Sequence, residues 1–136
     1  MKTEIEVLKQ VEHPNIVRLF DVYEDERTWC LVMELMEGGE LLDKILATDQ
    51  FSERDARNCI IAIIDAIRYC HGLGIIHRDI KPENLLLADA DGGLSSLKVA
   101  DFGLARQFAG YEALMKQLAS TTCGTPGYVA PEIIKK

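Results

Sequence analysis

The sequence predicts an α+β fold, and three observations point to it. Apolar residues recur at intervals of three and four between residues 52 and 72, which indicates a long amphipathic helix. Two pairs of short apolar segments, 16–20 with 29–33 and 85–88 with 97–100, have polar turn residues between them and are typical of hairpin strands. The 136 residues, of which 48% are hydrophobic, are enough for one ordinary core.

The first part of the chain is predicted as a helix followed by one of these strand pairs. A helical stripe covers residues 3–12 and consists of Ile5, Leu8 and Val11. Pro14 ends this helix, because the residue before a proline avoids the helical conformation. The strands 16–20 and 29–33 come next, with their turn at residues 25–27.

The middle of the chain contains a break at residues 37–40, a short helix over 41–46 and then the long helix. Ser52 can cap the long helix, and Asp55 lies three residues further on, as in a capping box that uses a carboxylate. Gly72 and Gly74 close the helix. The apolar stripe expected to face the core consists of Ala56, Ile60, Ile63, Ile67 and Cys70.

A strongly polar stretch follows at residues 77–84. It reads His-Arg-Asp-Ile-Lys-Pro-Glu-Asn between apolar segments, and its proline prevents a continuous helix. This pattern indicates a functional loop between two buried strands. The strand over 85–88 comes next, and after a turn at 89–96 the strand over 97–100 leads into Asp-Phe-Gly at 101–103.

Composition narrows the class of protein. The net charge of -7 argues against nucleic acid as a partner and favours basic ligands or peptides. The longest apolar run, residues 59–64, is too short to span a membrane, and the first residues lack the apolar segment of a signal peptide. The cysteines lie apart without a Cys-x-x-Cys pair, as in proteins whose thiols stay reduced. We therefore expect a cytoplasmic protein, with the nucleus as an alternative, and no membrane partner.

Three motifs occur in a defined order. The loop at 77–84 resembles the pattern H-R-D-L-x-x-x-N, with Ile80 in place of leucine. Asp-Phe-Gly at 101–103 follows, and then a Gly-Thr-Pro-Gly-Tyr and Ala-Pro-Glu series within 124–132. Each motif alone is common by chance, but the complete series is specific. The chain resembles the catalytic domain of serine/threonine protein kinases, and residues 123–132 most resemble the calcium/calmodulin-dependent kinase group.

The resemblance covers the whole chain and implies a protein-kinase-like two-lobe fold that is only partly represented, from helix C to the Ala-Pro-Glu motif. Residues 1–36 match the end of the small β lobe with the hinge. Residues 37–136 match the first half of the mainly helical large lobe, with the catalytic and activation loops. The family's Gly-rich loop and the strand lysine that pairs with Glu4 are not in this sequence. Lys2 does not replace that lysine, because residues two apart on a helix do not face each other.

The resemblance implies ATP-dependent transfer of the γ-phosphate to serine or threonine hydroxyls. Asp79 would accept or orient the hydroxyl, Lys81 would contact the γ-phosphate, and Thr125 would bond to both residues. Asn84 and Asp101 would bind Mg²⁺, which prefers hard oxygen ligands and takes its remaining ligands from phosphates and water. The expectation is that Asp79, Asn84 and Asp101 converge on one magnesium-bound ATP.

The nucleotide-binding residues implied by the resemblance are Glu34, Met36, Glu40, Glu83, Asn84, Leu86 and Asp101. The backbones of Glu34 and Met36 would bond adenine, which explains why their side chains need not be polar. Glu40 would lie near the ribose and Leu86 beneath the adenine ring. Glu40 and Glu83 also match acids that, in some members of the family, receive an arginine of the substrate, so a basic peptide substrate is expected.

The residues implied in regulation are Glu4, Arg78, Phe102 and Thr121. Glu4 matches the helix-C glutamate, and the alternative is an exposed acid in the first helical turn. Arg78 would pair with a phosphate that an upstream activating kinase adds to Thr121. The phosphate could instead be on a neighbouring hydroxyl, or these hydroxyls could be unmodified. Phe102 would pack inward in a stack with Leu8, Leu19 and His77.

Three hypotheses follow for the function of the chain. It belongs to an active serine/threonine kinase that uses ATP and Mg²⁺ and acts on protein or peptide substrates. Alternatively, it is a catalytically inactive kinase fragment that acts as a binding or regulatory module, or it is a product without a stable fold. For the 136 residues by themselves, negligible turnover is expected, together with exposed apolar surface.

Overall fold

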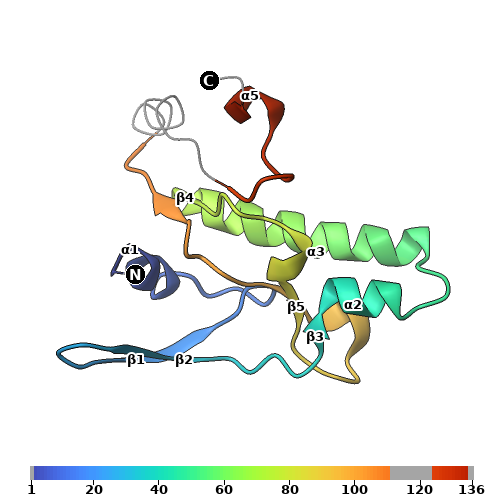
Figure 1. Ribbon diagram of the computed structural model, residues 1–136, viewed down its shortest axis with the longest axis horizontal. Coiled ribbons are helices and arrows are strands. Elements are labelled where there is room, and N and C mark those ends of the chain that lie inside the picture. The colour runs from blue at the N-terminus through green and yellow to red at the C-terminus, as the bar shows by residue number, and fades with distance from the viewer. Residues whose placement is uncertain (1, 111–123, 135–136) are drawn as a thin grey trace.

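The computed structural model describes residues 2–110 and 124–134, and it is built around one long helix, α3 (Glu53–Gly72) (Figure 1). The elements before α3 are α1 (Lys2–Leu8), β1 (Leu19–Glu24), β2 (Trp29–Met33), β3 (Gly39–Glu40) and α2 (Leu41–Leu46). Those after it are β4 (Ile75–Ile76), η1 (Pro82–Asn84), β5 (Leu85–Leu87), η2 (Gly93–Ser96), β6 (Leu97–Val99), β7 (Arg106–Gln107) and α5 (Pro131–Ile134). The predicted α+β class is confirmed. The division of the chain into a small-lobe part, residues 1–36, and a large-lobe part, residues 37–136, stays a prediction.

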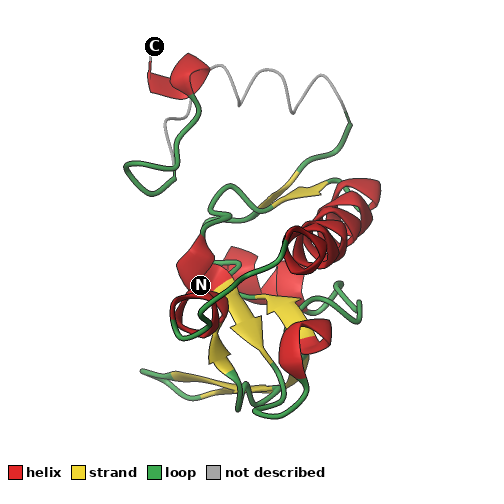
Figure 2. Cartoon of the chain, turned by 90° about the vertical axis from the view of Figure 1, so that its right-hand side faces the viewer, coloured by secondary structure: helices red, strands yellow, loops and turns green. Residues whose placement is uncertain are grey.

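The strands of the described residues form small antiparallel sheets. β1 pairs with β2, β5 lies between β3 and β6, and β4 pairs with β7. The predicted pairing of residues 85–88 with 97–100 is confirmed by β5 and β6, and the other predicted hairpin is confirmed with its first strand displaced. The pairing of β4 with β7 was not predicted, because two-residue strands leave no periodic signal in the sequence. Figure 2 shows α3 lying along one side of the strands, with α5 apart from them.

The predicted helix over residues 3–12 is wrong at its end, because α1 stops at Leu8. The following turn is tighter than an α-helix: the Gln10 amide bonds the Val7 carbonyl at 3.0 Å, three residues back. The predicted strand over 16–20 is also displaced. Residue 16 forms a parallel bridge with Val99 of β6, and β1 begins only at Leu19. Both apolar residues at 16 and 17 are buried, so this segment does not show the alternation of a half-exposed strand.

The predicted start and end of α3 are confirmed. The Ser52 hydroxyl accepts a hydrogen bond from the Asp55 amide at 3.1 Å and donates one to the Asp55 carboxylate at 2.6 Å. Gly74 follows the helix with a φ of +71°, and a Cβ there would lie 2.7 Å from the Phe108 carbonyl oxygen, so both the turn and the close approach require glycine. The predicted inward position of Ile60 is wrong, since this side chain is 53% exposed.

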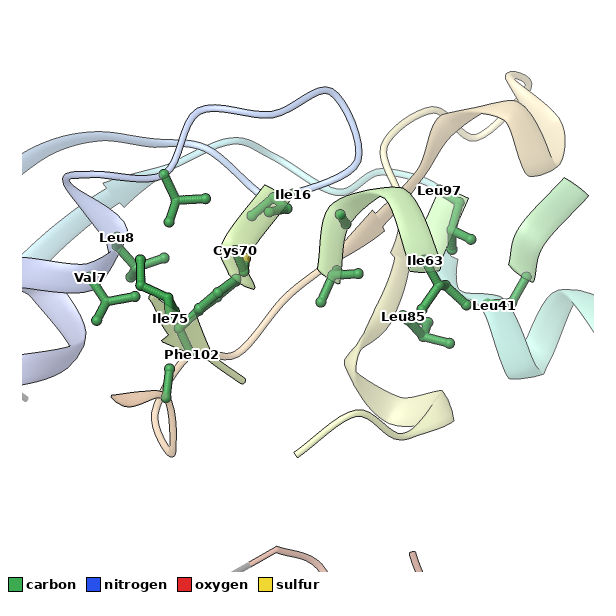
Figure 3. Packing of buried hydrophobic residues seen from close by; sticks show 14 of the residues in the cluster. Val7, Leu8, Ile16, Leu41, Ile63, Cys70, Ile75, Leu85, Leu97 and Phe102 are labelled. Carbon is green, nitrogen blue, oxygen red and sulfur yellow. The ribbon is translucent and has the colours of Figure 1, made fainter. Parts of the chain in front are cut away.

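The core lies between α3, α1, α2 and the strands. Figure 3 shows its side chains in two neighbouring groups, one beside α1 with Leu8 and Phe102, the other beside α2 with Leu41 and Leu97. α3 supplies Cys59, Ile63, Ala66 and Cys70 to this core. Burial raises the pKa of the Cys70 thiol to about 11, so it is an inert apolar side chain at neutral pH. In the described part of the chain, no helix is both long and apolar enough to cross a membrane.

Candidate active site

The polar loop that follows β4 forms the centre of the site. β4 ends at Ile76 and β5 begins at Leu85, so two strands anchor the loop at its ends. Pro82 occupies the first turn of η1, where its missing N–H costs no hydrogen bond. Three polar side chains of this loop are buried, namely His77, Asp79 and Asn84. Buried polar groups need partners, and the contacts described below supply them.

Both carboxylate oxygens of Asp79 are used. Its Oδ1 accepts from the Thr125 hydroxyl at 2.6 Å and from the Thr125 amide at 3.1 Å. Its Oδ2 accepts from the Asn84 side-chain amide at 3.2 Å and lies 3.1 Å from the Lys81 ammonium. The Lys81 ammonium also donates to the Thr125 hydroxyl at 2.9 Å. Asp79, Lys81 and Thr125, predicted as the catalytic set, therefore form one closed network.

The electrostatics of this network keep Asp79 ionised. Burial alone would raise the pKa of its carboxyl, but the hydrogen bonds from Thr125 and Lys81, the Lys81 charge and the Asn84 amide outweigh burial and hold that pKa below its usual value. His77 behaves differently, because burial lowers the pKa of its imidazole despite the bond to Ala100 and the charges of Asp101 and Asp79. The site at pH 7 thus contains a carboxylate anion, a lysine cation and a neutral histidine.

Asp101 follows β6, which pairs with β5. Ala100 lies next to it, and its amide donates to the Asn84 carbonyl at 2.9 Å. The Ala100 carbonyl lies 3.0 Å from His77 Nε2. Because the Asp79 amide donates to His77 Nδ1 at 3.3 Å, Nε2 carries the proton and donates to Ala100. These contacts tie the segment that carries Asp101 to the loop that carries Asp79 and Asn84.

The oxygens of Asn84 and Asp101 suit a magnesium ion. Both hydrogen bonds that the Asn84 side chain makes in the described chain use Nδ2, which leaves its amide oxygen available. Asp101 is exposed, and its Oδ1 accepts only the Gly103 amide, at 3.1 Å, from the residues described. No cluster of three His, Cys, Asp or Glu side chains that could hold a metal occurs in the described segments. Two protein oxygens supplemented by phosphates and water are the arrangement that Mg²⁺ tolerates.

Strained backbone coincides with the site. Within residues 2–110 and 124–134, Arg78 and Asp101 are the non-glycine residues with positive φ, at 69° and 60°. Such conformations are costly and persist where the surrounding structure enforces them. The Arg78 side chain helps to do so, because its Nε donates to the Leu104 carbonyl at 2.7 Å. Arg78 thereby joins the loop of Asp79 to the segment that follows Asp101.

The residues predicted to bind the nucleotide lie in β3, η1 and β5 and in the segments that follow β2 and β6. Leu86 is paired directly with Glu40 of β3, so these two share a face of the sheet. The Glu34 side chain is engaged elsewhere: Oε1 lies 2.8 Å from the Lys98 ammonium, and Oε2 accepts from the Arg18 amide at 3.1 Å. The Glu34 backbone amide is engaged as well, donating to the Arg18 carbonyl at 2.8 Å, so the backbone carbonyl is the part of this residue available to a base within the described chain. Met36, two residues further on, is half-buried, and Glu83 is exposed in η1.

The residues predicted to regulate the site are placed as follows. Phe102 is fully buried, and its ring meets that of His77 edge-on at 4.7 Å between centroids. Leu8 belongs to the same core, and Leu19 packs against it. The Glu4 carboxylate is close to Gly103, because a Cβ placed there would lie 3.9 Å from Glu4 Oε1. Thr121 lies outside the described residues.

Several long-range contacts of the fold were not predicted. His13 Nε2 lies 3.3 Å from an Asp65 carboxylate oxygen of α3, and Gln10 exchanges hydrogen bonds with Gln107 of β7. The Lys98–Glu34 ion pair was also missed. The partners lie 52, 97 and 64 residues apart, and no local sequence pattern marks such pairs.

The chain is similar to known proteins along its whole length. The family model for the protein kinase domain matches residues 1–136. Calcium/calmodulin-dependent protein kinase type IV of Mus musculus is 47% identical over 135 residues, which are 99% of this chain and 28% of that relative. Myosin light chain kinase A of Dictyostelium discoideum is 46% identical over 134 residues, 98% of this chain and 43% of that relative.

A third relative, calcium/calmodulin-dependent protein kinase type 1 of Caenorhabditis elegans, is 44% identical over 137 residues, 100% of this chain and 37% of that relative. These similarities confirm the resemblance to kinases of the calcium/calmodulin-dependent group. The chain spans between 18% and 43% of the length of the curated relatives it matches.

Proposed function

Because this chain belongs to the protein kinase family and to its serine/threonine kinases, we propose that its site transfers the γ-phosphate of ATP to serine or threonine hydroxyls. The observation that carries the proposal is the closed network of Asp79, Lys81 and Thr125 beside Asn84. It combines a buried, ionised carboxylate with a partly buried cation and hydroxyl. Phosphoryl transfer needs an oriented acceptor hydroxyl and cations near the group in transfer, and this network offers a carboxylate that could orient the substrate hydroxyl and a lysine cation.

In this proposal, Asp79 orients the substrate hydroxyl and accepts its proton. Its lowered pKa keeps the carboxylate ionised at neutral pH, and the Thr125 bonds fix its direction. Lys81 stands two residues away and partly neutralises the negative charge of the phosphate. Because Thr125 bonds both side chains, it sets their spacing before substrate arrives.

Asn84 and Asp101 would hold Mg²⁺ through their side-chain oxygens. The bound ion would neutralise the phosphates of ATP. For this purpose the chain keeps the Asn84 amide oxygen without a partner in its described part and anchors Asp101 through Ala100. The backbones of Glu34 and Met36 are proposed to bond adenine, with Leu86 beneath the ring and Glu40 near the ribose.

The proposed substrate is a basic peptide. Glu83 is exposed beside the catalytic loop, Glu40 is half-buried, and the chain as a whole carries a net charge of -7. These acids would attract arginine or lysine near the target hydroxyl. A peptide array that showed a preference for acidic residues upstream of the target would overturn this part of the proposal.

The proposal extends to the regulation and the location of the protein. We propose that an upstream kinase phosphorylates Thr121 and that Arg78 pairs with the phosphate, since the guanidinium is only half-buried and already joins two segments of the site. The described cysteines, Cys30, Cys59 and Cys70, are unpaired thiols, which supports a cytoplasmic or nuclear compartment.

The test is transfer of radiolabelled phosphate from ATP to a basic peptide by the natural protein that carries this sequence. Transfer is expected with Mg²⁺, and Asp101→Ala is expected to abolish it. Asp91→Asn, which removes the charge of an exposed carboxylate in a turn, serves as the control and should keep full activity. No transfer by the natural protein, or full activity in Asp101→Ala, would overturn the proposal.

A further inference from the structure

Gln10 and Gln107 form a pair that joins three elements of the fold. Gln10 follows α1, and Gln107 is the last residue of β7, 97 positions further along the chain. The Gln107 Nε2 donates to Gln10 Oε1 at 2.9 Å, and the Gln10 Nε2 donates back to Gln107 Oε1 at 3.2 Å. The second N–H of each amide goes to a backbone carbonyl, that of Glu6 at 2.8 Å and that of Leu73 at 3.3 Å.

The two carbonyls explain why both residues are amides. The Gln10 backbone amide bonds Val7, so the Glu6 carbonyl lacks its usual helical donor, and the Gln10 side chain supplies one. Leu73 is the residue at the C-terminal end of α3, where carbonyls also lack helical partners. Turning either amide over would set its oxygen against one of these carbonyl oxygens. The pair therefore has a single favourable orientation and satisfies four acceptors at once.

The pair lies at one end of a longer contact between α1 and the segment that starts at Asp101. Glu4 of α1 approaches Gly103, with 3.9 Å between Glu4 Oε1 and the position of a Cβ on that glycine. Gln10 then meets Gln107. Residues 103–107 thus run beside α1 in the same direction. The Glu4 side chain, at the near end, makes no hydrogen bond or ion pair within the described part of the chain. The amide pair is therefore the polar contact that holds the two segments together there.

We propose that the Gln10–Gln107 pair is a positioning contact for phosphoryl transfer, which holds residues 101–107 against α1 and so keeps Asp101 in place to bind magnesium-bound ATP. The proposal rests on the proposed function of the site. Asp101 has a φ of 60°, a conformation that its own backbone does not favour and that neighbouring contacts must enforce. Without the pair, other conformations of Asp101 become more populated. The apparent affinity for ATP then falls in proportion to the fraction of molecules in which Asp101 keeps its binding conformation.

The experiment exchanges the amide pair for an ion pair. Gln10→Lys, Gln107→Glu and the double variant are compared with the natural protein for kcat and for the KM of ATP at saturating Mg²⁺. Each single change removes one of the two hydrogen bonds between the side chains, because lysine at position 10 cannot accept from Gln107 and glutamate at position 107 cannot donate to Gln10. A roughly fivefold rise in KM is expected, the size of one net hydrogen bond. In the double variant, lysine at position 10 can donate both to the carboxylate at 107 and to the Glu6 carbonyl. Its KM is therefore expected to rise less than that of Gln107→Glu alone.

Gln50→Glu is the matched control, since it introduces the same charge at an exposed glutamine before α3 and should leave the KM of ATP unchanged. Partial unfolding would lower kcat per mole of protein without raising KM, so a rise in KM with rescue distinguishes positioning from stability. A double variant whose KM rises by the product of the two single effects would overturn the proposal. Unchanged KM values in both single variants would overturn it as well.

A second readout separates this proposal from the proposed function. The Phe108 amide donates to the Gly74 carbonyl at 2.9 Å directly after Gln107, so its hydrogen exchange reports whether the segment is held. Exchange at Phe108 should accelerate in Gln107→Glu and recover in the double variant, whether or not the protein transfers phosphate. A natural protein without phosphate transfer would defeat the proposed function. An unaltered exchange rate in Gln107→Glu would defeat the positioning contact.

Discussion

Asp79 and Asp101 are the two carboxylates that we propose act in one site, yet the fold treats them in opposite ways. Asp79 is buried, and each of its oxygens has partners from Thr125, Asn84 or Lys81. Asp101 is exposed and accepts one backbone amide within the described residues. A carboxylate that must aim a hydroxyl benefits from being fixed by several donors, whereas one that must bind a cation needs oxygens that are not already occupied.

The two carboxylates are also supported differently. Side chains of other residues hold Asp79. One of them belongs to Thr125, which lies 46 residues further along the chain. Asp101 is held through its neighbours, since Ala100 bonds to Asn84 and Phe102 inserts into the core. On one side, a polar network of side chains therefore fixes Asp79. On the other side, contacts of the neighbouring residues fix the backbone of Asp101.

The largest effect is expected from Asp79→Asn. An amide in this place cannot accept the proton of a substrate hydroxyl, and it would also face the Lys81 and Thr125 donors with an N–H group. The value of kcat should fall by roughly 10² to 10⁴, the range for a lost general base. Steady-state transfer to a basic peptide measures it, with Asp91→Asn as the control. A loss below about tenfold would contradict the role given to Asp79.

The backbone anchor of Asp101 is tested by Phe102→Ala. Phe102 is 1% exposed, and its removal should lower the free energy of unfolding by about 3–5 kcal/mol, as for other buried aromatic residues. Urea unfolding of the natural protein and the variant measures this change. Phe20→Ala is the matched control, because Phe20 is 59% exposed and should cost roughly 0.5 kcal/mol or less. Equal costs for the two changes would show that Phe102 is not an anchor.

The two sides of the site differ in how far they could be predicted from the sequence. Asp79, Asn84 and Asp101 were predicted because their motifs are local and ordered along the chain. The closure of the network by Thr125 followed from the resemblance alone, since no periodicity connects residues 79 and 125. The short helix α2, strand β2 and the Ser52 cap were also predicted, because each has a local signal.

The misses have physical reasons. Ile60 was predicted to face the core from spacing alone. The buried side of α3 instead consists of Cys59, Ile63, Ala66 and Cys70, and Ile60 lies about one residue away from it around the helix. The Gln10–Gln107 pair and the β4–β7 pairing come from tertiary contacts between segments of two or three residues. Such contacts have no period, so sequence patterns cannot indicate them.

A smaller effect is expected from Thr125→Val, which keeps the shape of the residue and removes its hydroxyl. The hydrogen bond from Thr125 helps to lower the pKa of Asp79, so its loss should raise that pKa. A carboxyl with a lowered pKa loses its ionised form only when the pH falls through that lowered value. The acid limb of the pH profile of kcat/KM should therefore move to higher pH in the variant. Thr48→Val, at an exposed threonine, should leave the profile unchanged.

The smallest effect is expected from the protonation of His77. Its imidazole bonds to the Ala100 carbonyl and to the Asp79 amide. Burial lowers the pKa of its imidazole below 6.5, so the unfolded chain binds a proton before the folded one does. Stability should then fall as the pH drops below the unfolded value, by at most about 1.4 kcal/mol per pH unit. Unfolding of the natural protein and of His77→Phe between pH 7 and pH 5 tests this. An identical pH slope in the two proteins would contradict a neutral, buried His77.

The opposite treatment of the two carboxylates is tested most directly by calorimetric binding of ATP, with and without Mg²⁺, to the natural protein, Asp79→Asn and Asp101→Asn. The Asp79 variant is predicted to bind magnesium-bound ATP nearly as tightly as the natural protein. The Asp101 variant should lose roughly tenfold or more of that affinity, and only when Mg²⁺ is present. Equal losses in both variants, or a loss confined to Asp79→Asn, would contradict the separation of a hydroxyl-orienting carboxylate from a metal-binding one.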